Sequence, residues 1–289
     1  MQASSPTFGP LVEAGWLADH LAEVVVCDVR WYLDDRSGRA AFEAGHMPGA
    51  RFVDVDLDLA GPPGGTEGRH PLPDPGAFAR AMRALGIGDG TRVVAYDDTG
   101  GSTAARLVWM LRVLGEPAAL LDGGIAAWPG PLAEGKAPTP TQATFTERPW
   151  PEAAIVTADA LAIELARGST VAIDARAGER YRGEVEPVDP RPGHVPGAQS
   201  VPWTSVLDPE TGRFRSAAAL RDRFAAVGVG DETPVVAYCG SGVTACIDVL
   251  AVEVAGLGPA RLFASSWSGW CADPGRPVAT GAEPGGAAR

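Results

Sequence analysis

The chain repeats itself, and this internal repetition constrains its fold more than any other feature of the sequence. Tyr96 and Tyr238 close two copies of the same four-residue run, 142 positions apart. A repeat of this length is a duplicated domain and not a solenoid unit. The matching blocks are Cys27-Asp28-Val29-Arg30 with Ile173-Asp174-Ala175-Arg176, Gly45-His46-Met47-Pro48-Gly49-Ala50 with Gly193-His194-Val195-Pro196-Gly197-Ala198, Leu85-Gly86-Ile87-Gly88-Asp89 with Val227-Gly228-Val229-Gly230-Asp231, and Val93-Val94-Ala95-Tyr96 with Val235-Val236-Ala237-Tyr238.

A proline-rich stretch separates the two copies. The chain has 289 residues, and domains usually hold roughly 100–200 residues, so its length allows two. Residues 129–151 are weakly periodic and contain Pro138, Pro140 and Pro149, which is typical of an extended linker. We therefore predict an N-terminal domain over residues 1–130, a linker over 131–151 and a C-terminal domain over 152–289.

Within each copy, short apolar runs alternate with segments of helical spacing. The pattern predicts strands buried on both faces at residues 24–27 and 92–96, and helices at residues 78–85 and 104–114. The same pattern recurs in the second copy. Strands that alternate with helices predict an α/β fold with a mainly parallel sheet flanked by helices. The fold class predicted is thus a tandem of two such domains.

Composition and charge exclude several classes of protein. Hydrophobic residues make up 45% of the chain, and the net charge is −12. A net negative charge opposes binding to nucleic acid or an anionic membrane, which requires clustered Lys and Arg. No apolar stretch approaches the roughly 20 residues of a membrane span, and the first residues lack the pattern of a secretory signal. We therefore expect a cytoplasmic protein with reduced thiols, in which Cys27, Cys246 and Cys271 are packing residues.

The fourth cysteine lies where chemistry is expected. Cys239 directly follows the strand predicted at residues 235–238 and opens a glycine-rich turn into a helix. Open α/β sheets bind ligands at the carboxyl ends of their strands, where a nest of backbone N–H groups and a helix N-terminus favour negative charge. The matching position in the first copy is Asp97. One copy therefore carries a nucleophile and the other does not, which predicts a catalytic C-terminal domain and a non-catalytic N-terminal domain.

These motifs together resemble the two-domain rhodanese-like sulfurtransferases, over both halves of the chain. The resemblance rests on Asp-x-Arg, on Gly-His-x-Pro-Gly-Ala and on the Ser266-Trp267-Ser268 motif near the C-terminus. The loop Cys239-Gly240-Ser241-Gly242-Val243-Thr244 is similar to that of the 3-mercaptopyruvate sulfurtransferases. Thiosulfate-using relatives typically carry basic residues directly after the cysteine, where this loop is neutral.

The resemblance implies a catalytic set around Cys239. Ser241 corresponds to the loop hydroxyl that polarises the substrate. His70 and Asp56 correspond to the residues that form a relay with this serine, and Asp54 and Asp58 are alternatives to Asp56. A histidine beside a carboxylate is a reasonable acid–base pair.

The resemblance also implies a substrate-binding set. Arg180 corresponds to the family arginine that binds the substrate carboxylate, for which a guanidinium is well suited. The family often places a second arginine after a Glu-Pro pair, but this chain has Val188 there, and Arg191 is the nearby candidate replacement. The loop positions expected to cradle the substrate are Gly240, Gly242, Val243 and Thr244.

The activity that these residues imply is sulfur transfer through a Cys239 persulfide, with no metal or organic cofactor. The expected partners are a small-molecule sulfur donor, 3-mercaptopyruvate, and a thiol acceptor such as a thioredoxin-like protein, or cyanide. One alternative is a thiosulfate:cyanide sulfurtransferase on the same fold, and another is a non-catalytic persulfide carrier. A Cys-x5-Arg phosphatase is disfavoured, because position 245 is Ala and the next arginine after Cys239 is Arg261.

Overall fold

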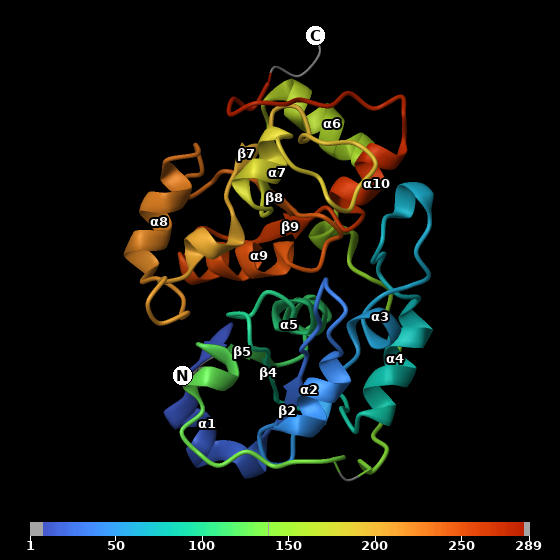
Figure 1. The fold of residues 1–289 in the computed structure, drawn as a ribbon, viewed down its shortest axis with the longest axis vertical. Helices are drawn as coiled ribbons and strands as arrows, with labels where there is room; N and C mark the ends of the chain where they lie inside the picture. Colours follow the sequence, from blue (N-terminus) through green and yellow to red (C-terminus); the bar gives the residue numbers. More distant parts are fainter. Residues whose placement is uncertain (1–7, 138, 286–289) are drawn as a thin grey trace, which may run out of the picture. The chain divides into compact units, whose positions relative to one another are not determined.

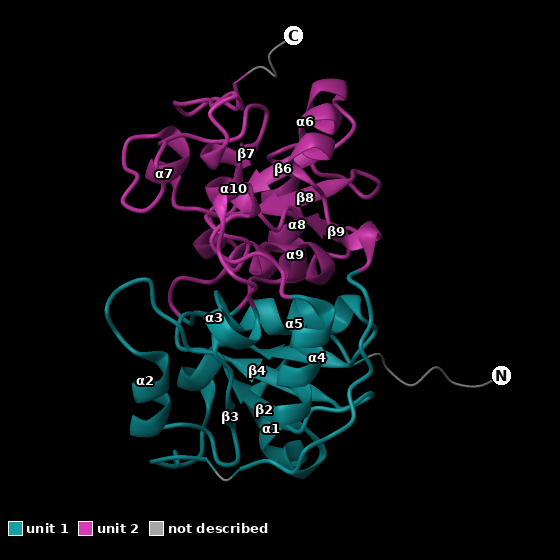
Figure 2. Ribbon diagram, turned by 90° about the vertical axis from the view of Figure 1, so that its right-hand side faces the viewer, with its two compact units in different colours: residues 1–59, 74–150, 211–213 teal, residues 60–73, 151–210, 214–289 magenta. Residues whose placement is uncertain are grey.

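The computed structural model describes residues 8–137 and 139–285, which form two compact units (Figure 2). Among these residues, unit 1 comprises 8–59, 74–137, 139–150 and 211–213, and unit 2 comprises 60–73, 151–210 and 214–285. This division differs from the predicted domain boundaries in three places, of which the shortest is residues 211–213, a part of the second half that packs with unit 1. The segment predicted as a linker packs with unit 1 up to Trp150, and residues 60–73, from the first half of the sequence, pack with unit 2.

Unit 1 is a parallel five-stranded sheet with helices on both faces (Figure 1). The strand order is β1-β5-β4-β2-β3. Side chains of α1 and α2 join the core on one face, and α5 packs against β4 and β5. The strands are β1 (Leu11–Val12), β2 (Val25–Asp28), β3 (Arg51–Phe52), β4 (Val93–Tyr96) and β5 (Ala118–Leu121), and the helices are α1 (Ala14–His20), α2 (Gly38–Ala44), α3 (Val55–Asp58), α4 (Pro75–Ala84) and α5 (Ala104–Val113).

Unit 2 repeats this architecture with a parallel four-stranded sheet in the order β7-β6-β8-β9. Helix α9 packs against β8 and β9, while α6 and α10 supply side chains to a separate core cluster. The strands are β6 (Val171–Asp174), β7 (Gln199–Ser200), β8 (Val235–Tyr238) and β9 (Ala260–Leu262), and the helices are α6 (Ala158–Arg167), α7 (Gly178–Arg182), α8 (Ala217–Ala225), α9 (Ala245–Val254) and α10 (Ser266–Ala272). The predicted fold class, two α/β copies with parallel sheets, is confirmed.

Short 3₁₀ helices complete both units, and side-chain caps set several helix starts. Asp74 accepts a hydrogen bond from the backbone N–H of Ala77, and Pro75 begins α4. Ser216 caps α8 in the same way. Such caps satisfy the N–H groups that the first helical turn leaves free. The 3₁₀ helices are η1 (Leu21–Glu23), η2 (Gly65–Glu67), η3 (Gly124–Ala127), η4 (Glu152–Ala154) and η5 (Trp203–Val206).

The repeated Asp-x-Arg and Gly-His-x-Pro-Gly motifs hold each other together. In unit 1, Arg30 pairs with Asp28 and donates a 2.7 Å hydrogen bond to the carbonyl oxygen of Gly45. In unit 2, Arg176 pairs with Asp174 and donates a bond of the same length to Gly193. Burial of these charges is tolerated because each is paired and hydrogen-bonded. The duplicated motifs are therefore structural.

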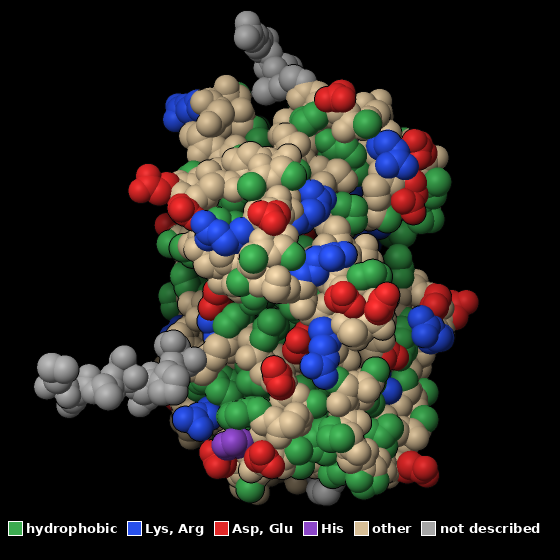
Figure 3. Space-filling view, turned by 90° about the vertical axis from the view of Figure 1, so that its left-hand side faces the viewer, with side chains coloured by type: hydrophobic (Ala, Val, Ile, Leu, Met, Phe, Trp, Pro, Cys, Tyr) green, Lys and Arg blue, Asp and Glu red, His purple; other side chains and the backbone are tan. Residues whose placement is uncertain are grey.

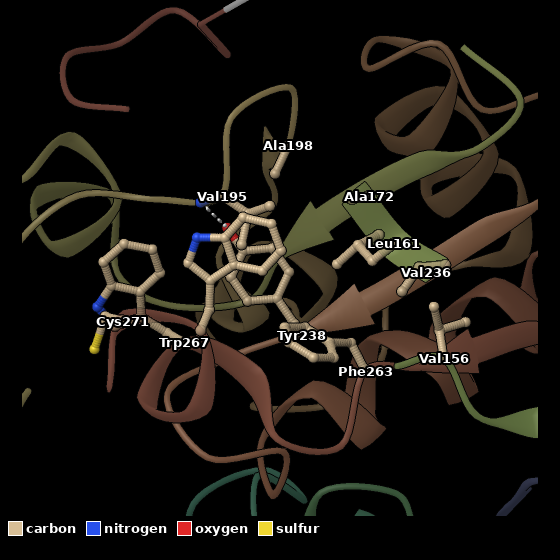
Figure 4. Packing of buried hydrophobic residues seen from close by; sticks show 11 residues of the cluster. Val156, Leu161, Ala172, Val195, Ala198, Val236, Tyr238, Phe263, Trp267 and Cys271 are labelled. Carbon is tan, nitrogen blue, oxygen red and sulfur yellow. Dashed lines mark hydrogen bonds between the residues drawn. The ribbon is translucent and has the colours of Figure 1, made fainter. Parts of the chain in front are cut away.

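The tyrosine that ends each central strand completes this arrangement. The hydroxyl oxygen of Tyr96 accepts a hydrogen bond from the backbone N–H of Met47, and Tyr238 accepts one from Val195. Figure 4 shows the latter bond within the core of unit 2, beside Trp267. Both tyrosines are fully buried. The last residue of each central strand thus anchors the Gly-His-x-Pro-Gly turn of its own unit.

No helix among the described residues is long and apolar enough to cross a membrane. On the face drawn in Figure 3, Lys and Arg side chains are interspersed with Asp and Glu side chains.

Candidate functional site

Cys239 lies between β8 and α9, where the strand ends and the chain turns into the helix. The residue is 4% exposed, and its Sγ accepts a hydrogen bond from the backbone N–H of Gly242 at 3.2 Å. Gly242 has a φ of +81°, and a Cβ atom there would clash with the carbonyl oxygen of Ala264. Only glycine fits this turn without strain. The predicted loop residues Gly240, Gly242, Val243 and Thr244 thus all belong to the turn around the thiol.

Further backbone N–H groups of this turn are available to an anion. Within the described part of the chain, no acceptor is found for the N–H groups of Ser241, Val243, Thr244 and Ala245. Thr244 precedes α9 without a side-chain cap. Uncapped N–H groups at a helix start carry a partial positive charge. The loop can therefore stabilise negative charge on or next to the Cys239 sulfur.

Helix α10 clamps the backbone of the cysteine loop through the Ser-Trp-Ser motif. Ser266 Oγ accepts a hydrogen bond from the N–H of Cys239 at 3.1 Å. The N–H groups of Trp267 and Ser268 donate to the carbonyl oxygens of Cys239 and Gly240 at 3.0 and 2.9 Å. Ser266 has a φ of +52°, which costs a non-glycine residue about 1 kcal/mol. The surrounding contacts hold it in this conformation and so fix the position of the loop.

Residues 60–73 dock against the same helix. The short helix η2 packs on α10, and a Cβ atom at Gly269 would lie 2.5 Å from the carbonyl oxygen of Thr66. This close approach leaves no room for a side chain at Gly269. Ser268 Oγ then accepts a 3.1 Å hydrogen bond from the N–H of Arg69. Docking therefore carries Arg69 and His70 into unit 2.

His70 contacts Ser241, a residue of the cysteine loop. His70 Nδ1 and Ser241 Oγ lie 2.7 Å apart, at hydrogen-bond distance, although 171 positions separate them in the sequence. Both side chains are buried. A neutral imidazole nitrogen in this place can accept the serine proton and return it. The structure thus brings two of the predicted catalytic residues together beside Cys239.

Asp56 lies in unit 1, in α3. Its Oδ2 accepts a 2.9 Å hydrogen bond from Trp31 Nε1. Its two neighbours serve the local backbone, because Asp54 caps α3 and Asp58 accepts the N–H of Asp54. Burial raises the pKa of Asp58 above its usual value. The relay role of Asp56 stays a prediction.

A network of arginines and carboxylates lies beside the loop. Arg180 donates to Glu186 at 2.6 Å and to Asp189 at 3.1 Å. Arg176 also contacts Glu186, and Arg69 pairs with Asp189 from the docked segment. Burial alone would raise the pKa of Glu186, but hydrogen bonds from Arg180 and from two backbone N–H groups lower it. For Asp189, burial outweighs the attraction of Arg69 and raises the pKa.

Arg69 was not among the predicted site residues. A Cβ atom built on Gly240 would lie 2.8 Å from Arg69 Nη2 and 3.6 Å from Arg180 Nη1. Two guanidinium groups therefore flank the residue that follows the nucleophile. The only sequence signal was that Arg69 precedes His70, which does not reveal where its side chain lies.

Arg191 is engaged elsewhere in unit 2. Its guanidinium donates to the carbonyl oxygens of Cys271, Arg276 and Asp273, at and beyond the end of α10. These bonds satisfy carbonyls that a helix C-terminus leaves free. A substrate-binding role for Arg191 stays a prediction and would require this cap to open.

The other three cysteines are buried thiols without a disulfide. Burial raises the pKa of Cys27 to about 12. Burial also raises the pKa of Cys271 above its usual value. Such thiols are poor nucleophiles, because the thiolate is the reactive form.

Two similar α/β units, with a thiol at the end of a parallel strand in one and a carboxylate at the same place in the other, define a duplicated α/β protein in which one copy carries a cysteine loop. The family model described as the rhodanese-like domain matches residues 13–130 and 157–273. The chain therefore belongs to the rhodanese-like family.

Close relatives carry the names of sulfurtransferases. A Pseudomonas aeruginosa protein named as a probable 3-mercaptopyruvate sulfurtransferase is 44% identical over 94% of this chain and 98% of its own length. A Mycobacterium tuberculosis protein, provisionally named a thiosulfate sulfurtransferase, is 39% identical over 89% of this chain and 91% of its own. The structure of the 3-mercaptopyruvate sulfurtransferase from Leishmania major superposes with a TM-score of 0.81 and 31% identity, over 92% of this chain and 75% of that one.

Proposed function

We propose that this protein is a sulfurtransferase that takes sulfur from 3-mercaptopyruvate, holds it as a persulfide on Cys239 and passes it to a thiol acceptor or to cyanide. The observation that carries the proposal is the site itself. The Cys239 sulfur accepts the N–H group of Gly242, and Ser241 in the same loop lies within hydrogen-bond distance of His70. The relatives named 3-mercaptopyruvate sulfurtransferases support the choice of donor.

The first half-reaction forms the persulfide. The Cys239 thiolate attacks the sulfur of 3-mercaptopyruvate, the sulfur–carbon bond breaks, and pyruvate leaves as its enolate. Ser241 polarises the carbonyl oxygen while His70 exchanges a proton with the serine. The N–H groups of the loop stabilise the charge on the persulfide. The enolate then takes up a proton and becomes pyruvate.

The second half-reaction transfers the outer sulfur to the acceptor. A thiolate attacks it, the sulfur–sulfur bond breaks, and Cys239 returns as a thiolate. This order is ping-pong covalent catalysis and requires no metal. A thioredoxin-like protein in the cytoplasm is the acceptor that the family resemblance favours. The net charge of −12 argues against a nucleic-acid partner.

Mass spectrometry without an acceptor tests the proposal. Incubation with 3-mercaptopyruvate should add one sulfur atom to a peptide containing Cys239 and release one pyruvate per enzyme. Cys239→Ser should abolish both, whereas Cys246→Ala, which removes another buried thiol of the same unit, should not. Sulfur on a different cysteine, or pyruvate release by Cys239→Ser, would refute the mechanism.

Thiosulfate remains the second candidate donor, because one relative carries that name and because guanidinium groups flank Gly240. Cationic side chains would favour the thiosulfate dianion. The same experiment with thiosulfate separates the two donors. A larger kcat/KM for thiosulfate than for 3-mercaptopyruvate would assign the protein to thiosulfate.

A further inference from the structure

The neutral cysteine loop lies beside two cations that come from other segments of unit 2. Arg69 arrives with the docked residues 60–73, and Arg180 lies in α7. Their side chains are 29% and 16% exposed, whereas Asp189 and Glu186, which hold them, are 2% and 3% exposed. The carboxylates are therefore buried, and the guanidinium groups keep access to solvent.

The donor atoms that the carboxylates leave free are the ones near the loop. Arg180 uses Nε and Nη2 for Glu186 and Asp189, and Arg69 uses Nη1 for Asp189. Arg69 Nη2 and Arg180 Nη1 have no acceptor among the described residues. These two atoms are the ones closest to a Cβ position on Gly240, at 2.8 and 3.6 Å. They are placed to receive an anionic group next to Cys239.

The network does not attract anions through an excess of charge. It joins Arg69, Arg176 and Arg180 to an equal number of carboxylates, those of Asp174, Glu186 and Asp189. An anion would instead be recognised by preorganised N–H donors, which need little reorganisation on binding. Such recognition depends on geometry, because each donor must point at the ligand.

The turn that lacks the family's second arginine also holds Arg69. The backbone N–H of Val188 donates to Glu186. The next residue, Asp189, pairs with both Arg69 and Arg180. The position that departs from the family pattern is thus followed directly by the residue that recruits an arginine from another segment.

We infer that Arg69 binds the carboxylate of the sulfur donor together with Arg180, that Asp189 positions the pair, and that Arg69 takes the place of the second arginine missing at Val188. This inference rests on the proposed function for the identity of the donor. It predicts that Arg69 discriminates between donors by their anionic group and not by their thiol.

Steady-state kinetics with two donors test this inference. Mercaptoacetone has the thiol and ketone of 3-mercaptopyruvate but a methyl group in place of the carboxylate. Arg69→Gln should raise the KM for 3-mercaptopyruvate about 10-fold or more, because charge-assisted hydrogen bonds are lost, and leave kcat within about 2-fold. It should change kcat/KM for mercaptoacetone less than about 2-fold. Arg69→Lys should be intermediate, since an ammonium cannot replace the planar fork.

Two further variants separate binding from folding. Arg182→Gln removes an exposed arginine that pairs with Glu184 and lies in α7, the helix of Arg180. It should leave kcat/KM for both donors unchanged. Gly240→Ala would place a methyl group 2.8 Å from Arg69 Nη2 and should raise the KM for 3-mercaptopyruvate more than the KM for mercaptoacetone. This second variant tests the inference even if Arg69→Gln fails to fold. Equal losses with the two donors, or no loss with either, would overturn it.

Calorimetry distinguishes this inference from the proposed function. In the Cys239→Ser background, which cannot form a persulfide, binding of 3-mercaptopyruvate should weaken about 10-fold when Arg69→Gln is added. An unchanged Kd overturns the role of Arg69, even if the wild-type enzyme releases pyruvate. A weakened Kd supports that role, even if the wild-type enzyme releases no pyruvate and the proposed function fails.

Discussion

The loop after β4 and the loop after β8 have the same place in their sheets but opposite contents. In the first, the Asp97 carboxylate accepts hydrogen bonds from four backbone N–H groups, and from the hydroxyl of Thr103 at 3.0 Å. The four donors are Thr99 at 2.9 Å, Gly101 at 2.7 Å, Thr103 at 2.9 Å and Ala104 at 2.9 Å. At the equivalent position, Cys239 Sγ accepts one, from Gly242.

The two turns share a backbone arrangement that binds a negative charge. Unit 1 fills the turn permanently with its own anion, and the fully buried Asp97 is stabilised by the N–H groups around it. Unit 2 places a thiol there and keeps N–H groups free for charge that forms during a reaction. The loop that holds the Asp97 carboxylate therefore shows how the Cys239 loop would hold a negative charge.

The largest effect should follow when Cys239 is replaced by the residue that stands at the equivalent position in unit 1. Cys239→Asp should lower sulfur transfer by more than about 1000-fold, because no nucleophile remains. It should also raise the free energy of unfolding by about 1 kcal/mol, because the carboxylate can accept the free N–H groups. Pyruvate release and urea denaturation measure the two effects.

Cys239→Ser is the control for this exchange. It should lose the same activity without the gain in stability, since a hydroxyl is a weaker acceptor than a carboxylate. If Cys239→Asp is less stable than Cys239→Ser, the two turns are not equivalent anion nests.

The second effect concerns the filled loop. Asp97→Ala should lower the free energy of unfolding by about 3 kcal/mol, because it leaves several buried N–H donors without an acceptor. Asp98→Ala, beside it, removes an exposed carboxylate that accepts one hydrogen bond from Tyr32, and should cost less than about 1 kcal/mol. Chemical denaturation measures the free energy of unfolding of both variants. Equal decreases in the two variants would argue against a special role for Asp97.

The third effect separates the chemistry of the two loops. Ser241→Ala should lower kcat about 100-fold, because the hydroxyl bonded to His70 is lost. Thr99 is the equivalent residue in unit 1, where it contacts Ser102. Thr99→Ala should leave kcat unchanged. Steady-state pyruvate release compares the two, and a kcat of wild-type size in Ser241→Ala would remove the serine from the mechanism.

The fourth and smallest effect concerns the helices that follow the loops. Position 106 in α5 is an arginine, whereas the equivalent position in α9 is Asp248. Asp248 is buried, and neither of its carboxylate oxygens accepts a hydrogen bond from the described residues. Burial raises its pKa well above the usual value, which the attraction of Arg223 only partly opposes.

A raised pKa means that the folded state keeps this proton while the unfolded state has lost it. The free energy of unfolding should therefore fall as pH rises above the unfolded pKa of about 3.9, by about 1.4 kcal/mol per pH unit from this residue. Asp248→Asn should lack this contribution. Urea denaturation at pH 5 and pH 6 measures the difference, and parallel pH dependences of the two proteins would show that Asp248 is ionised when folded.

Much of the fold and part of the site could be predicted from the sequence, because their signals are local. The duplicated motifs, the apolar runs of the central strands and the turn after Tyr238 are each encoded in a few neighbouring residues. They were sufficient to predict two parallel α/β copies and to select Cys239 over the other thiols.

The side chains that surround that thiol depend on the tertiary structure. Residues 60–73 reach unit 2 because Gly269 leaves room for the backbone at Thr66, and no local pattern in either segment records this docking. The same docking brings Arg69 beside Gly240, while the end of α10 engages Arg191. Contacts between side chains so far apart in the sequence depend on how the backbone segments pack. The type and spacing of residues therefore predict the chemistry of a site, but not which distant side chains lie next to it.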